Sequence, residues 1–71
     1  NPINSGEEML IEAETAIDQI WLYDQQSRLV GSWQANHQQS IKLNLNKLDL
    51  GLYYLQIELD GNRITKKVIL H

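Results

Sequence analysis

The sequence predicts an all-β fold, a small antiparallel β-sandwich of six or seven strands. Three observations predict it: apolar and polar residues repeatedly alternate with a period of two, helical spacing is poor, and short turn signals separate the alternating stretches. A chain of 71 residues is long enough for one domain and a thin core. We therefore expect residues 1–71 to form a single domain.

The N-terminal third contains two predicted strands. Residues 9–13 alternate in polarity, which predicts the first of them. Residues 17–23 favour strand, with Ile20 and Leu22 on one face and Trp21 and Tyr23 on the other. We expect both faces of this second strand to be at least partly covered.

Polar residues then predict a turn and a longer connection. The polar residues 24–27 suit a turn, and residues 29–33 predict a short strand. Residues 34–40 are almost entirely polar, which predicts a connection rather than a strand.

The middle of the chain contains the clearest alternation. The odd positions of residues 41–45 are apolar and the even positions polar, so burial of one face specifies the register. Residues 47–51 predict a loop, with Leu48 as an apolar plug beneath it. Gly51 is expected to supply a backbone conformation that a side chain would obstruct.

The last two predicted strands form a hairpin. Residues 52–59 place apolar side chains at odd positions, and residues 63–70 form the returning strand. Between them, Asp60-Gly61-Asn62 predicts a tight turn, because such turns need residues that tolerate positive φ. Sequential hairpins of this kind favour an immunoglobulin-like (Ig-like) two-sheet sandwich over a closed barrel.

Charge is unevenly distributed along the chain. The net charge is −3, yet residues 1–24 contain six acidic residues and no Lys or Arg. Nucleic-acid binders usually show a concentrated basic surface and a high pI, so we expect no nucleic-acid partner. No apolar run approaches the roughly 20 residues of a membrane helix, and we expect no membrane insertion.

We expect neither catalysis nor a cofactor. The chain has no cysteine, and neither His37 nor His71 begins a pair with metal-ligand spacing. Glu12 and Glu14 share a strand face in a pattern typical of solvent exposure, and no serine stands in a recognisable relation to a base.

Aromatic residues and two lysines leave alternatives open. Trp21 and Tyr53 are expected in the core, whereas Trp33 and Tyr54, if exposed on one face, would favour an Ig-like surface module that binds carbohydrate or protein. Lys66 and Lys67 have two possible roles. They would either block unwanted strand pairing at an edge or mark a strand that a partner recognises by strand addition. A structural spacer, the third alternative, predicts sequence continuing after His71.

The order of several motifs resembles the type A C-terminal sorting domain of the type IX secretion system, found in Bacteroidota. The motifs are an opening Asn-Pro, a strand ending in Tyr-Asp, a turn into a basic residue and valine, a Leu-x-x-Gly-hydrophobic-Tyr element, and a lysine followed by an aliphatic run. In this chain they are Asn1, Pro2, Tyr23, Asp24, Arg28, Val30, Leu48, Gly51, Leu52, Tyr53, Lys67, Val68, Ile69 and Leu70. The family usually has glycine just before the basic residue, where this chain has Ser27, so the resemblance leaves the turn type open.

The resemblance implies a sorting signal behind an N-terminal passenger in the same precursor. Its implied partners are the outer-membrane translocon, shuttle proteins and a surface sortase that removes the domain by cleavage upstream of Asn1. The passenger would be exported through the periplasm and outer membrane, then attached to the cell surface or released. The residues expected to be recognised are Gly51, Tyr53, Lys66, Lys67, Val68, Ile69 and Leu70; the other motif residues are expected to be structural.

Overall fold

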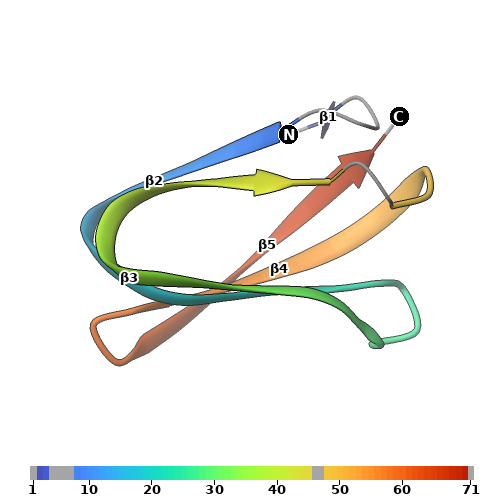
Figure 1. Cartoon of the computed structure of the whole chain (residues 1–71). Coiled ribbons are helices and arrows are strands. Elements are labelled where there is room, and N and C mark those ends of the chain that lie inside the picture. The colour runs from blue at the N-terminus through green and yellow to red at the C-terminus, as the bar shows by residue number, and fades with distance from the viewer. Residues whose placement is uncertain (1, 4–7, 46–47, 71) are drawn as a thin grey trace.

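A computed structural model describes residues 2–3, 8–45 and 48–70 of the chain. These residues form one five-stranded sheet in the order β1-β5-β4-β2-β3 (Figure 1). All neighbouring strands are antiparallel except β1 and β5, which are parallel. The strands are β1 (Pro2–Ile3), β2 (Glu8–Tyr23), β3 (Leu29–Asn44), β4 (Gly51–Leu59) and β5 (Asn62–Leu70). The expectations for Asn1 and His71 lie outside the described residues.

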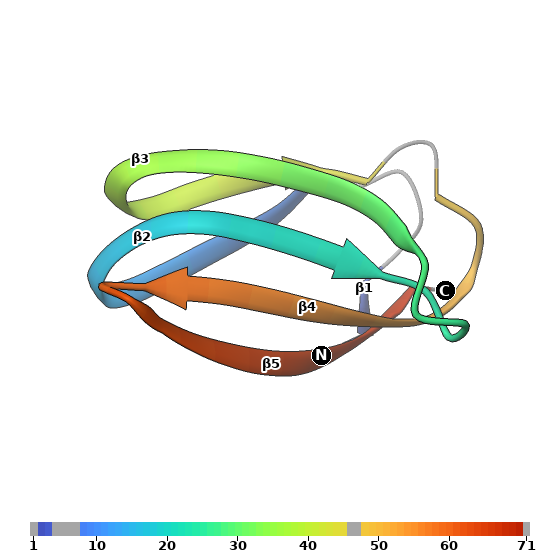
Figure 2. The same cartoon turned by 90° about the horizontal axis from the view of Figure 1, so that it is seen from below.

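The all-β class is confirmed, but the expected sandwich of six or seven strands is wrong. Stretches that the sequence separates are joined: residues 9–13 and 17–23 belong to β2, and residues 29–33, 34–40 and 41–44 belong to β3. The two long strands, β2 and β3, pair with each other and bend together. The first part of β2 and the last part of β3 thereby fold back over the rest of the sheet (Figure 2). Two layers thus arise from one sheet.

Irregular pairing in the middle of β2 and β3 accounts for the bend. Between the pairs Glu12–Ser40 and Ile17–Gln38, β2 contains four residues, 13–16, whereas β3 contains only Gln39. The Gln39 side chain donates a hydrogen bond of 2.7 Å to the Glu14 carbonyl within this irregularity. Extra residues on one strand bend it and increase its twist.

A second irregularity lies on β3, inside the expected connection at residues 34–40. Asn36 and His37 adopt left-handed φ angles of 53° and 61°. His37 Nδ1 lies 2.9 Å from Asp18 Oδ1 on the neighbouring strand, which ties the irregularity to β2. The stretch is polar because β3 is the last strand of the sheet and exposes most of its side chains here, and that exposure made it resemble a loop.

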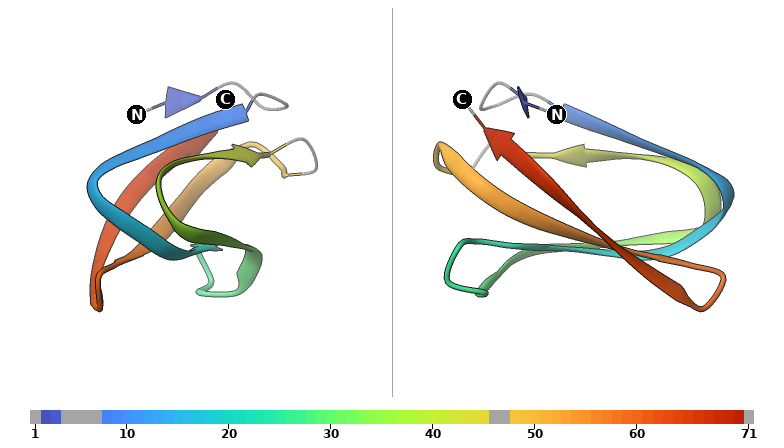
Figure 3. Two further views of the ribbon diagram at one scale, coloured as in Figure 1. Left: turned by 60° about the vertical axis from the view of Figure 1, so that its left-hand side comes forward. Right: turned by 180° about the vertical axis from the view of Figure 1, so that it is seen from behind.

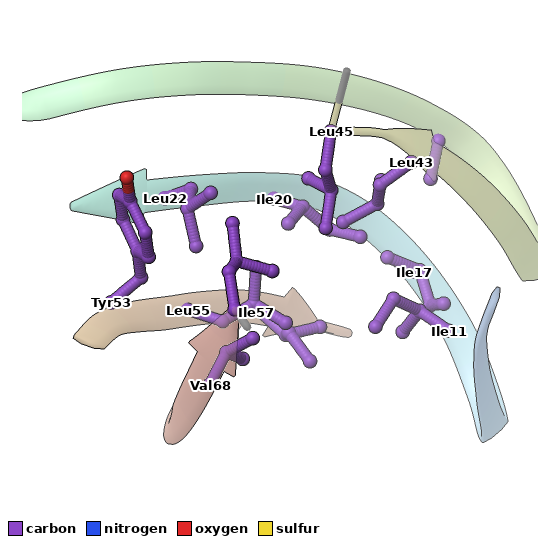
Figure 4. Packing of buried hydrophobic residues seen from close by; sticks show 12 residues of the cluster. Ile11, Ile17, Ile20, Leu22, Leu43, Leu45, Tyr53, Leu55, Ile57 and Val68 are labelled. Carbon is purple, nitrogen blue, oxygen red and sulfur yellow. The ribbon is translucent and has the colours of Figure 1, made fainter. Parts of the chain in front are cut away.

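The core lies between the two layers. Leu43 near the end of β3 and Leu45 just after it point toward Ile20 and Leu55 in the opposite layer (Figure 4). The expected burial of alternate positions in residues 41–45 and 52–59 is confirmed, although Ile41 and Leu59 are only partly buried. The buried residues are Ile11, Ile17, Ile20, Leu22, Ala35, Leu43, Leu45, Tyr53, Leu55, Ile57, Val68 and Leu70.

The expected hairpin between β4 and β5 is confirmed. Leu59 pairs with Asn62, leaving Asp60 and Gly61 as a two-residue loop. Their φ angles of 48° and 83° are both positive, as the primed turns of tight hairpins require.

The two described ends of the chain meet at the other end of β5. Pro2 pairs with Ile69 and Ile3 with Leu70, in parallel register. Figure 3 shows β1 beside the tip of β5 and near the start of β2. The N-terminal segment therefore completes the ladder that begins with β4 and β5.

The aromatic residues divide between the two faces of the sheet. Tyr53 is buried as expected, but Trp21 is not in the core: it is half-buried on the outer face, with the Arg63 guanidinium 4.3 Å from its ring centre. Trp33 pairs with Ile20 on the inner face and packs against the core, whereas Tyr54 lies on the outer face beside buried Tyr53. Trp33 and Tyr54 thus do not form the shared exposed surface that would favour a carbohydrate-binding module.

Candidate functional site

Most of the motif residues gather at one end of the molecule, which we call the motif end. It consists of the β2–β3 turn at residues 24–28, the β3–β4 loop at residues 48–50, and the adjoining ends of β4, β5 and β1. Two shallow hollows lie there, and both are lined by Asp24, Arg28, Asp49 and Tyr53. Motifs that are far apart in the sequence therefore build one surface.

Asp24 and Arg28 hold the β2–β3 turn together. One carboxylate oxygen of Asp24 accepts hydrogen bonds from the backbone N–H groups of Gln26 and Arg28, both at 2.9 Å. The other oxygen accepts a bond of 2.8 Å from Nε of Arg28. The backbone N–H of Arg28 is the main cause that holds the pKa of the Asp24 carboxyl below its ordinary value. The carboxylate therefore stays charged, and its contacts persist, until the solution becomes strongly acidic.

Ser27 occupies a left-handed backbone position within this turn. Its φ is 63°, and its backbone N–H donates to the Asp24 carbonyl at 3.1 Å. A residue with a Cβ is disfavoured in this region, whereas glycine enters it readily. The turn type that the sequence left open is thus one in which glycine fits well.

Replacing Ser27 with glycine is expected to stabilise the domain by about 0.5–1 kcal/mol, because it relieves the left-handed strain while keeping the backbone hydrogen bond. Ser32→Gly is the matched control, since Ser32 is equally exposed but lies within β3, where glycine should cost about 0.5–1 kcal/mol. Urea unfolding of both variants measures the difference. Destabilisation of both proteins by the same amount would contradict the role assigned to the turn.

Tyr53 holds the β3–β4 loop from its core side. Its ring is buried, and its hydroxyl donates a hydrogen bond of 2.7 Å to the Asp49 carbonyl, four residues earlier. Burial is the main cause that raises the pKa of the Tyr53 hydroxyl. Leu48 packs against the core beside it, which confirms the expected plug. These contacts, together with a hydrogen bond of 3.2 Å from the Leu48 backbone N–H to the Leu45 carbonyl, hold the described part of the loop.

Gly51 begins β4 with a φ of 141°, a conformation that L side chains rarely adopt. The expectation that the backbone here requires glycine is confirmed. A Cβ at this position would meet no neighbouring atom within 4 Å, so the constraint comes from the conformation of the backbone itself.

Apolar side chains are exposed around the hollows of the motif end. Leu50 is 66% exposed and lines one hollow; Leu29 and Val30, 55% and 37% exposed, line the other. The sequence marked Val30 but gave no signal for Leu29 and Leu50, because an alternating pattern does not reveal which apolar residues a loop leaves uncovered. Exposed apolar groups beside charged ones are typical of protein-binding surfaces.

The expected recognition residues of β5 divide into two groups. Val68 and Leu70 are buried, so they hold the strand in place. Lys66, Lys67 and Ile69 are exposed, with Lys66 on the inner side of the sheet and Lys67 and Ile69 on the outer side. Lys67 lies in one row with Tyr54 and Tyr23 across the sheet. The outer side of β5 thus combines a positive charge with aromatic neighbours.

Acidic and histidine side chains are spread over the part of the chain that the structure describes. No group of three or more His, Cys, Asp or Glu side chains there has a geometry that would hold a metal ion. Within the same residues, no helix has the length and apolar character needed to cross a membrane. Glu12 and Glu14 are exposed, as expected.

The motif end exposes apolar side chains beside charged ones, and the outer side of β5 exposes Lys67 and Ile69. A model of the secretion system C-terminal sorting domain family matches residues 1–71, the whole chain, and the chain belongs to this family. It is a C-terminal sorting signal of the type IX secretion system, and members of this family are generally non-catalytic. A search of curated proteins returned no match.

Proposed function

We propose that residues 1–71 act as one folded, non-catalytic label that directs an N-terminal passenger through the type IX outer-membrane translocon. A surface sortase then removes the label, and the passenger is attached to the cell surface or released. The observation that carries this proposal is the family match over the whole chain, combined with the gathering of its motifs at one end of the fold.

We assign recognition to the exposed residues of the motif end and of β5, and support to the buried ones. Gly51, Tyr53, Val68 and Leu70 act by fixing the backbone and the core, so their effect on sorting is indirect. The exposed charges of β5 are available to a partner that adds a strand or contacts the outer face. The shuttle and translocon proteins are the proposed partners of this surface.

Fusing residues 1–71 behind a reporter in a type IX-competent bacterium is expected to deliver the reporter to the cell surface. Replacing both Lys66 and Lys67 with glutamine should reduce delivery, because it removes two exposed charges while keeping most of the side-chain length. Lys42→Gln, which removes an exposed charge from β3, is the matched control. Surface immunolabelling and cell fractionation measure delivery, and circular dichroism checks that each variant folds.

Two outcomes would count against the proposal. If the unaltered fusion stays inside the cell, the sorting assignment fails. If the double lysine variant is delivered as well as the control, the assignment of recognition to these lysines fails. Deleting residues 65–71 is less informative, because it also removes buried Val68 and Leu70 and would unfold the domain.

A further inference from the structure

The two layers of the sheet do not close on the side where residues 8–14 of β2 lie across from β5. A groove of about 480 Å³ runs between them. Leu10 and Ile11 line it from one layer, and Ile57 and Ile64 from the other. Leu10 and Ile64 remain 52% and 40% exposed, so the groove leaves apolar surface in contact with water.

The strands that border the groove each present an edge with unused backbone hydrogen-bonding groups. Among the described residues, residues 8–12 of β2 pair with β3 alone, and residues 62–68 of β5 pair with β4 alone. An apolar groove beside such edges is the geometry that accepts an additional strand, since main-chain bonds and alternating side-chain contacts form together. We call this groove and its two edges the β2–β5 slot.

The register of β1 determines which segment points into the slot. Pro2 and Ile3 pair in parallel with Ile69 and Leu70, at the end of β5. In a parallel ladder, earlier residues of one strand lie beside earlier residues of the other. The backbone direction of β1 therefore points back along β5 toward Asn62, and in Figure 3 β1 lies between the tip of β5 and the start of β2.

We propose that the segment joining the passenger to residue 1 occupies the β2–β5 slot as a strand parallel to β5. This inference rests on the proposed function, which places a passenger before residue 1. About seven linker residues would run beside residues 62–68, since paired strands advance in step. Alternate linker side chains on the inner face then cover Ile64 beside buried Ile11, so we expect them to be apolar.

Charged side chains border the slot on both strands. Glu12 and Glu14 line it from β2 and Lys66 from β5, so both signs are within reach of the linker. The arrangement also makes the linker and any strand-adding partner compete for the same edge of β5. Engagement of that edge by the secretion machinery would expose the linker.

The test is backbone amide hydrogen exchange, measured by mass spectrometry on the full-length precursor. The amides of about seven residues before residue 1 are expected to exchange at least about tenfold more slowly than in an unstructured peptide. Ile64→Lys places a charge in the slot and should abolish this protection. Thr65→Lys is the matched control: it adds the same charge one residue later, on the outer face of β5, and should leave the protection intact.

Three results would overturn the inference. The linker amides could exchange at the unstructured rate in the unaltered precursor, or their protection could survive Ile64→Lys. Protection that rises with protein concentration, together with a dimer in light scattering, would assign the slot to a second copy of the chain. If the linker is unprotected but the passenger is still exported, only this inference fails, whereas loss of export from the unaltered precursor removes the proposed function itself.

Discussion

Replacing Tyr53 with alanine is expected to lower the free energy of unfolding by about 3–5 kcal/mol, because it removes a buried aromatic ring and leaves a cavity. The ring is 6% exposed and lies at the motif end of the core. Tyr53→Phe keeps the ring and loses only the hydrogen bond to the Asp49 carbonyl, so its expected cost is about 1 kcal/mol. A chain of 71 residues has a stability of roughly 4–10 kcal/mol, so the alanine variant would be close to unfolding.

Urea unfolding followed by circular dichroism measures both variants, with Tyr54→Ala as the matched control. Tyr54 is the next residue of β4 but lies on the outer face and is 37% exposed, so its loss should cost much less. Equal losses for Tyr53→Ala and Tyr54→Ala would show that the ring of Tyr53 does not fill the core.

The Tyr53 hydroxyl also gives a second, independent measurement. Burial raises its pKa, so the folded protein holds this proton at a pH where the unfolded chain, with an ordinary pKa near 10.0, has released it. The contribution of the protonated Tyr53 hydroxyl to stability is complete below the pKa of the unfolded chain. It is lost as the pH rises toward the higher pKa of the folded protein. We expect unfolding midpoints of the unaltered protein to fall above pH 10 more steeply than those of Tyr53→Phe.

Leu55→Ala is expected to destabilise the domain by about 2–5 kcal/mol and to abolish sorting of a fused reporter. Leu55 is fully buried between the layers, where truncation removes apolar contacts and leaves a void. The substitution changes no exposed residue. It therefore separates recognition of a folded surface from recognition of a linear segment.

The matched control for the stability measurement is Leu50→Ala, the same change at a side chain that is 66% exposed. Its unfolding midpoint should move little, because the side chain is mostly hydrated in both states. Delivery of a reporter by Leu55→Ala at the unaltered level, with the domain shown to be unfolded, would mean that the machinery reads the sequence of β5 without its fold.

The sequence predicts the second half of the fold well because its signals there are local. The alternation in β4 and β5 and the Asp60-Gly61 turn depend on neighbours in the chain, and each was confirmed. The prediction for the first half of the chain fails because it depends on where each strand lies in the sheet. Residues 34–40 belong to a strand at the border of the sheet, where water satisfies polar side chains, so their composition does not distinguish a strand from a loop.

The sequence predicted which residues belong to the candidate site, but it did not predict how they are arranged in space. The motif order identified Asp24, Arg28, Gly51 and Tyr53, yet only the fold places them around common hollows. The Asp49 carbonyl that binds Tyr53 has no sequence signal, since every residue carries a backbone carbonyl. The β2–β5 slot likewise depends on how far the sheet folds over, which no local pattern encodes.

The pairing of β1 with the tip of β5 joins residues 2–3 to residues 69–70, nearly the full span of the domain. A ladder between such distant partners can form only after residues 69–70 have been synthesised, because closing so long a loop requires both of its ends. Prematurely terminated chains that lack β5 would never assemble this surface. The surface at the motif end therefore forms only when both termini of the domain are present, so its integrity depends on residues at opposite ends of the domain sequence.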